Sequence, residues 1–238
     1  MKKIFSPKYL PGISLGAGVL GLVLRLWLYS LRDADGLLPR NHIAVPLLFI
    51  LTGLTLAALF LCVRQIPQKS SFAQHFRPSV WGCAGNLVAA AGLLVWCVLE
   101  FATRQDIFPL ICLPFGVIAG TCLVLAGLCR FRGMVPSFII YCLVTVYLMV
   151  HTISQCRSWS SEPQLMHYCF QLLASIFAMI SAFHRTALTL DKGDYRLFVF
   201  SAQAVLFFCC LSANTENALF YLSIGIWSAT DLWQLQEA

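Results

Sequence analysis

The residues of this 238-residue sequence that could do chemistry are ionisable groups within or beside long apolar stretches: Arg25, Glu100, His151, Glu162 and His167. A charge in the hydrocarbon of a membrane costs roughly 2.5–3.5 kcal/mol on insertion scales, so such a group usually serves a substrate site or pairs with another charge. Histidine also titrates near neutral pH, which suits proton transfer. We predict that these five residues line a substrate pathway that opens on the outer face of a membrane.

Each of these residues also has a structural interpretation, which the sequence leaves open. Arg25 and Glu100 fall in the outward parts of two apolar stretches, at depths that match an Arg–Glu ion pair. They could instead extend separately to the outer interface, as long charged side chains do. His151 and His167 flank one predicted outer loop, where solvated histidines need no function.

No arrangement of residues predicts catalysis. The histidines lack the HxxxH and HExxH spacings of metal sites, and there is no Walker A sequence. We therefore predict no catalytic residue, no metal and no cofactor. The interpretation that we favour is that the protein is not an enzyme. A lipid-modifying enzyme that uses His151, Glu162 and His167 is the weakest of the functions considered.

The eleven cysteines are expected to be free thiols. Most lie in apolar stretches, where cysteine acts as a small hydrophobic residue. Cys156 and Cys169 flank the same predicted outer loop and could form a disulfide in an oxidising compartment. Free thiols remain the favoured interpretation.

The composition places the chain in a lipid bilayer. It is 59% hydrophobic and only 11% charged, with a mean hydropathy of +0.80. A soluble domain carries about 25% charged residues, because it must cover its surface for water. The formal net charge is +6, but no run of basic residues is long enough for a nucleic-acid patch, so nucleic acid is not an expected partner.

Apolar stretches of about twenty residues, the length that crosses a bilayer as a helix, recur along the whole chain. We predict an all-α, polytopic membrane protein in which residues 1–238 form one transmembrane domain of about eight helices. The last two stretches are short and are separated only by residues 213–216, so seven spans remain an alternative. The predicted spans are residues 11–31, 43–63, 80–102, 107–128, 134–153, 165–185, 197–212 and 217–235.

The distribution of lysine and arginine predicts the orientation. With eight spans, eleven of these residues lie on the side of the N-terminus and four on the other side. Cytoplasmic loops carry the excess of positive charge. We therefore predict a multi-pass protein of the plasma membrane with both termini in the cytoplasm.

Small residues spaced four apart predict where helices approach closely. They form the pairs Gly12 and Gly16, Ala17 and Gly21, and Gly116 and Gly120. Their positions suggest tight packing of the first four spans. The last four spans are rich in phenylalanine and are expected to have looser, lipid-facing surfaces.

Many spans, no long soluble segment and intramembrane charges favour a small transporter or permease. A non-enzymatic subunit or sensor is the alternative, and its glycine-rich first half would contact a membrane-protein partner or a second copy of the chain.

Overall fold

The computed structural model describes residues 10–31, 42–66, 72, 76, 78–103, 107–160 and 168–235. Within these ranges the regular structure consists of eight long α-helices and includes no strand. The prediction of an all-α protein is confirmed. In chain order the helices are α1 (Leu10–Ser30), α2 (Ala44–Val63), α4 (Val80–Thr103), α5 (Ile107–Phe131), α6 (Phe138–Trp159), α7 (Cys169–Thr189), α8 (Tyr195–Ser212) and α9 (Ala218–Leu235).

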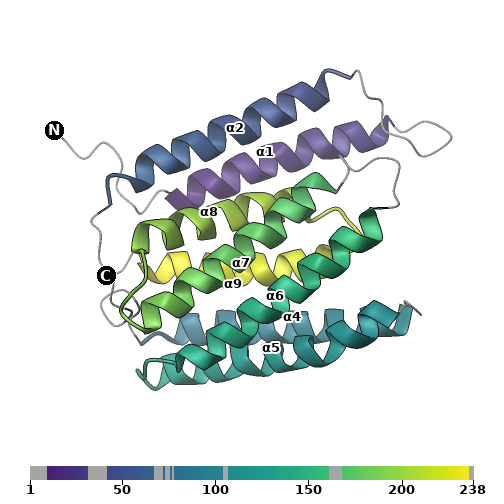
Figure 1. Cartoon of the computed structure of the whole chain (residues 1–238). Helices are drawn as coiled ribbons and strands as arrows, with labels where there is room; N and C mark the ends of the chain where they lie inside the picture. Colours follow the sequence, from purple (N-terminus) through teal and green to yellow (C-terminus); the bar gives the residue numbers. More distant parts are fainter. Residues whose placement is uncertain are drawn as a thin grey trace.

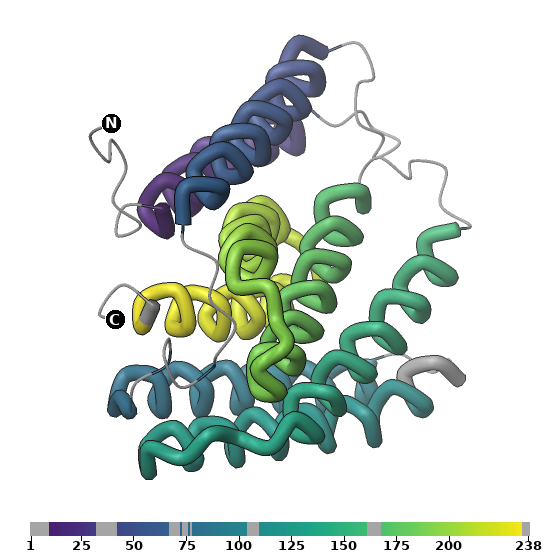
Figure 2. The backbone as a smooth tube through the Cα atoms, turned by 60° about the vertical axis from the view of Figure 1, so that its left-hand side comes forward, coloured from purple at the N-terminus to yellow at the C-terminus, as the bar shows by residue number. Residues whose placement is uncertain are grey.

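The helices lie side by side, and successive helices run in opposite directions (Figure 1). α1 begins and α9 ends at the same end of the bundle, which we call the N-terminal end. α8 and α9 are central: α8 packs against α1, α2, α7 and α9, and α9 also packs against α4. The α1–α2 hairpin therefore lies on one side of these two helices, and α4 and α5 lie on the other (Figure 2).

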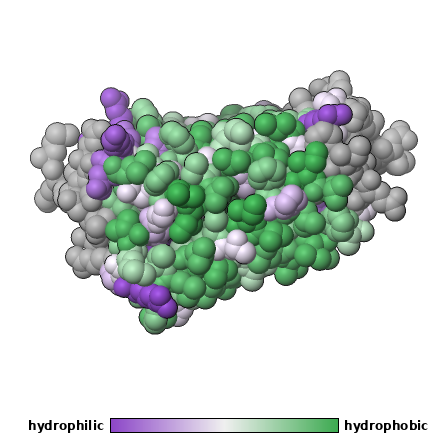
Figure 3. All heavy atoms as spheres, turned by 60° about the horizontal axis from the view of Figure 1, so that its bottom comes forward, coloured by the Kyte–Doolittle hydropathy of each residue, from purple (hydrophilic) through white to green (hydrophobic). Residues whose placement is uncertain are grey.

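Seven of the eight helices are long and apolar enough to cross a membrane. The face shown in Figure 3 is covered across its middle by apolar residues, with polar residues toward the two ends. These features confirm a polytopic helical membrane protein. The eighth helix, α9, pairs with α8 as the expected hairpin; it is not among the seven, and it carries Asp231 and Gln234 near its end.

Most predicted helix boundaries are correct within a few residues, but α6 begins and ends later than expected. α5 is terminated by Gly133, which has φ +70°. Pro136 then disfavours a helical conformation for the residue before it, so α6 starts only at Phe138. The helix continues through polar residues to Trp159, because hydropathy alone does not end a helix. His151 consequently lies inside α6 and not at its end.

The expectation that the last four helices have looser, lipid-facing surfaces is wrong. α8 is the most buried of the candidate spans, whereas α1 and α2 are the least buried. Phe198, Phe207 and Phe208 are completely buried in α8. Large aromatic rings fill the protein interior as readily as they face lipid, so phenylalanine content did not distinguish the two environments.

The closest helix contacts are made by glycines of α4 against α9. A Cβ atom at Gly85 would overlap the side chain of Thr230, and one at Gly92 would overlap Ser223. Replacing these glycines would therefore push α9 away from α4. The central polar helix is held against a surface made of small residues.

The five glycines predicted to pack helices divide into two groups. Gly21 of α1 lies against α8, and Gly116 and Gly120 of α5 lie against α4. Gly12 and Gly16 face open space in the described part of the chain, because none of its atoms outside α1 lies within 4 Å of a Cβ atom placed there. The close contact expected at these two positions is not made among the described residues.

Candidate functional site

Arg25 and Glu100 are not brought together. Arg25 is buried in α1, where its Nη1 donates a hydrogen bond of 2.5 Å to the carbonyl of Leu211 and its Nε donates one of 2.9 Å to the hydroxyl of Tyr29. Glu100 belongs to α4, on the other side of α8 and α9 (Figure 2). The predicted Arg25–Glu100 ion pair is therefore replaced by contacts of Arg25 with α1 and α8.

His151 is a buried residue and not a solvated one at a loop edge. Its ring centroid lies 5.0 Å from that of Trp96, 5.9 Å from Tyr147 and 4.1 Å from Phe220. Three aromatic rings from α4, α6 and α9 thus enclose the imidazole. The other two predicted pathway residues, Glu162 and His167, lie outside the described residues. The eleven cysteines, Cys156 and Cys169 included, are free.

Two short sequence motifs overlap in α1, and the helical structure is incompatible with the function of either one. Residues 12–16 read GxSxG and residues 16–21 read GxGxxG. The first motif requires a sharp turn between a strand and a helix, and the second requires a turn at the end of a strand. Here both lie within one continuous helix, and the hydroxyl of Ser14 donates a 2.6 Å hydrogen bond to Gln203 of α8. Neither a nucleophilic serine nor a dinucleotide site results.

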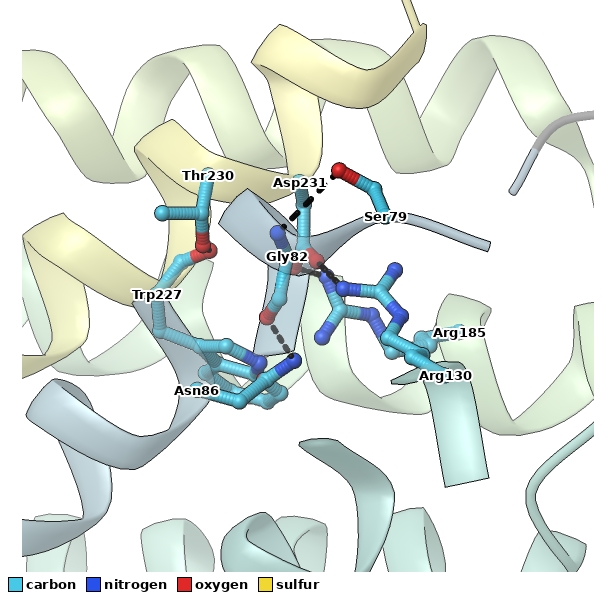
Figure 4. A network of polar contacts seen from close by, with 8 residues as sticks. All are labelled: Ser79, Gly82, Asn86, Arg130, Arg185, Trp227, Thr230 and Asp231. Carbon is cyan, nitrogen blue, oxygen red and sulfur yellow. Dashed lines mark hydrogen bonds and ion pairs between the residues drawn. The ribbon is translucent and has the colours of Figure 1, made fainter. Parts of the chain in front are cut away.

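The most highly charged buried group in the described part of the chain lies at the N-terminal end of the bundle. Asp231 of α9 is fully buried between two arginines, Arg130 of α5 and Arg185 of α7 (Figure 4). Nη1 of Arg130 lies 2.6 Å from Oδ1 of Asp231, and Nη2 of Arg185 forms an ion pair with Oδ2. We call these three residues the arginine–aspartate cluster. The cluster joins three helices through one carboxylate.

Arg130 is positioned by the way α5 ends. The N–H of Gly133 bonds to the carbonyl of Arg130 at 3.2 Å, and that of Met134 bonds to the carbonyl of Cys129 at 2.9 Å. These two bonds, with Gly133 in the left-handed region, form a Schellman cap. Arg130 therefore lies in the last turn of the helix, where the helix dipole favours a cation.

α7 ends with the same kind of cap. The N–H of Asp191 bonds to the carbonyl of Leu188, and that of Lys192 bonds to the carbonyl of Ala187, both at 3.0 Å. Asp191 takes φ 56°, a conformation that a short polar side chain tolerates. Arg185 lies about one turn before this cap. Both arginines are thus presented near helix C-termini at the same end of the bundle.

Both guanidinium groups lie over aromatic rings. Cζ of Arg130 lies 4.5 Å from the ring centroid of Phe76, and Cζ of Arg185 lies 4.4 Å from that of Trp227. Tyr141 adds a further ring at 5.2 Å from Cζ of Arg185. Such contacts stabilise a buried cation by about 2 kcal/mol or more when water is excluded.

The arginine–aspartate cluster has more donors and more positive charge than its own residues neutralise. Among the described residues, two guanidinium groups against one carboxylate leave one positive charge. In the same part of the chain, Nε and Nη2 of Arg130, and Nε and Nη1 of Arg185, are buried and have no hydrogen-bond partner. Nε1 of Trp227 and Nε2 of Gln234 are two further unpartnered donors on α9. An arrangement of this kind is suited to holding an anion.

Sequence reasoning missed this cluster because it placed Arg130 and Arg185 among the loop charges that set topology. In the structure the two arginines are only 3% and 2% exposed. Without them, nine lysines and arginines remain on the side of the N-terminus, against four on the other side. A signal was present in the sequence. Asp231 lies inside the last predicted span, and a carboxylate in a span requires a cation near it.

The fold and this cluster define a polytopic α-helical membrane protein that carries buried ionic groups in the interior of its helix bundle. No family model matches the chain, and no similar protein was found among curated proteins or among solved structures. The function must therefore be inferred from the geometry of the bundle.

Proposed function

We propose that this protein is a small transporter or permease of the plasma membrane. The observation that carries the proposal is the arginine–aspartate cluster, in which two buried arginines and one buried aspartate leave a net positive charge among the described residues. Buried ions are costly in a membrane-spanning bundle, so a cluster that is not electrically balanced calls for a reason. Surplus charge is expected where a solute of opposite charge passes.

Polar side chains along α9 support a pathway through the middle of the bundle. This central helix carries buried polar residues over its whole length, and the hydroxyl of Tyr221 near its start donates a 3.0 Å hydrogen bond to Gln155 of α6. A solute crossing beside α9 would find hydrogen-bonding groups at successive depths. The buried polar residues of α9 are Tyr221, Ser223, Ser228, Asp231 and Gln234.

We further propose that both termini are cytoplasmic. The excess of lysine and arginine on the side of the N-terminus supports this orientation. Because α1 begins and α9 ends at the same end of the bundle, the two termini share one side of the membrane if every helix crosses it. The arginine–aspartate cluster would then lie near the cytoplasmic face, and Arg25 and His151 toward the outer face.

Transport can be tested with purified protein in liposomes. We expect uptake of at least one solute from a labelled panel of carboxylates, phosphate, amino acids and sugars, above that of protein-free liposomes. Arg185→Lys keeps the charge but loses the planar guanidinium, and it should reduce the uptake. Arg132→Lys is the matched control, because Arg132 is exposed two residues beyond Arg130. Absence of uptake, or equal uptake by both variants, would contradict the proposal.

A second candidate, a subunit of a membrane complex, is favoured by the uncovered glycines of α1. Gly12 and Gly16 form a small-residue surface that no other described helix occupies, and another helix could approach there closely. The partner would be another membrane protein or a second copy of this chain within the bilayer, and not nucleic acid. Cross-linking in native membranes tests this candidate. A chain that cross-links to nothing through α1 would argue against it.

The enzyme alternative receives no support from the described residues. His151, the histidine it would use, is enclosed by aromatic rings, and the proposed partners Glu162 and His167 lie outside the described residues. We therefore do not propose a lipid-modifying activity.

A further inference from the structure

We propose that the arginine–aspartate cluster binds an oxyanion, a carboxylate or a phosphate group, at the guanidinium edges that Asp231 leaves free. In one respect this inference rests on the proposed function, since it names the substrate class of that transporter. Binding itself does not require transport and can be measured separately.

The free edge of Arg130 is the centre of the proposed site. Arg130 uses only Nη1 to contact Asp231, and its Nε and Nη2 are buried without a partner. In a guanidinium the N–H bonds of Nε and Nη2 point in the same direction and form a fork. That fork matches two oxygens of a carboxylate or a phosphate. Cζ of Arg130 lies over the ring of Phe76, and the unpartnered Nε and Nη2 are the atoms that a ligand would contact.

Arg185 and its neighbours supply further donors around the same carboxylate. Arg185 uses Nη2 for Asp231, and its buried Nε and Nη1 have no hydrogen-bond partner among the described residues. The indole of Trp227 packs on this guanidinium, and its own Nε1 is a buried, unpartnered donor. Figure 4 shows both arginines and Trp227 gathered around the end of α9. The elements α5, α7 and α9 therefore each contribute a donor.

The charge of the site favours an anion over water. Buried polar atoms in native proteins are nearly always satisfied, and a water molecule could satisfy these N–H groups. Water would leave unbalanced the positive charge that remains among the described residues, however, and an uncompensated buried charge is costly. A group with about one negative charge satisfies the donors and the charge together.

The oxyanion could come from a dissolved solute or from the headgroup of an anionic lipid, because the arginines lie near helix ends. We would measure the unfolding midpoint of the purified protein in phosphatidylcholine nanodiscs, with acetate, phosphate or chloride at equal ionic strength. A second set of nanodiscs would contain phosphatidylglycerol, with chloride as the only dissolved anion. Acetate or phosphate should raise the midpoint above that in chloride, because a ligand that binds only the folded state stabilises it.

Arg130→Lys keeps the charge and removes the fork. The acetate or phosphate concentration for half of the shift should rise about tenfold to a hundredfold, the effect of losing roughly one charge-assisted hydrogen bond. Arg132→Lys should leave it unchanged. If Arg130→Lys does not fold, Asp231→Asn serves instead: it removes the competing carboxylate, so acetate should raise its midpoint more than that of the wild type.

The outcomes separate the site from the transporter. A shift caused only by phosphatidylglycerol and lost in Arg130→Lys would support the site and identify the headgroup as its oxyanion. An acetate or phosphate shift without uptake in liposomes would support the site while the transport proposal fails. If no anion produces a shift that depends on Arg130 or is enhanced in Asp231→Asn, the proposed site is overturned.

Discussion

At the scale of single residues, Asp231 has the largest effect on the balance of charge inside the bundle. It is the one carboxylate that pairs with both Arg130 and Arg185 among the described residues. As a negative charge close to the C-terminus of α9, it also opposes the helix dipole, and only the two arginines compensate for this. Its removal would leave two guanidinium groups buried together.

We therefore expect Asp231→Ala to lower the free energy of unfolding by about 3–5 kcal/mol, the usual cost of breaking a buried ion pair from one side. Thermal or denaturant unfolding in detergent would measure the loss. Asp194→Ala is a suitable comparison, since it removes the same charge but only the N-cap of α8, worth about 1 kcal/mol. Equal losses in the two variants would show that the buried ion pairs contribute little.

At the scale of elements, glycines have two different roles that the sequence does not distinguish. Gly85 of α4 allows α9 to approach, because a Cβ atom at this position would overlap Cγ2 and Cβ of Thr230. Gly12 of α1 has open space around it. The same residue type in the same kind of helix is thus required for packing at one position and not at the other.

Alanine substitution should separate these roles. Gly85→Ala should destabilise the protein by about 1–3 kcal/mol through overpacking against α9. Gly12→Ala should be neutral or stabilising by up to about 1 kcal/mol, because alanine is the better helix former. Unfolding midpoints of the two variants in the same detergent provide the measurement. A destabilised Gly12→Ala variant would instead indicate that a partner helix occupies this surface.

The cap of α5 gives a second test at this scale. Gly133 has φ +70°, and an added Cβ would also lie 3.0 Å from Cγ of Pro78. We expect Gly133→Ala to cost about 1–2 kcal/mol. Asn tolerates the left-handed region better, so Gly133→Asn should cost less than Gly133→Ala. The same unfolding assay measures both losses of stability. An equal loss in the two variants would identify the contact with Pro78 as the cause.

At the scale of the whole molecule, hydropathy predicted the positions of the helices but not their arrangement. Apolar length placed all eight, because spanning a bilayer and packing in an interior both require apolar residues. For the same reason it could not show that α8 and α9 are central. From the sequence alone, the phenylalanines of α8 could equally face lipid, although Phe207 is completely buried in the structure.

The arginine–aspartate cluster could not be predicted for a different reason. Arg130 and Arg185 lie near helix ends, where sequence reasoning expects loop charges, and only the packing of α5 and α7 against their neighbours buries them. Asp231 was visible as a polar residue in the last span, but its partners lie 101 and 46 positions away in the chain. Nothing in local periodicity connects residues at such separations.

The orientation of the whole molecule is a prediction that the bundle makes testable. Eight alternating helices return the chain to the side on which it began, so a reporter at either terminus should give the same result. We expect a fluorescent protein fused at either end to fluoresce in a bacterial host, and alkaline phosphatase fused there to be inactive, as for cytoplasmic termini. Opposite results at the two termini would mean that α9, the one described helix outside the seven candidate spans, does not cross the membrane. Active phosphatase at both termini would keep the eight crossings and reverse the sidedness, which would place the arginine–aspartate cluster at the outer face.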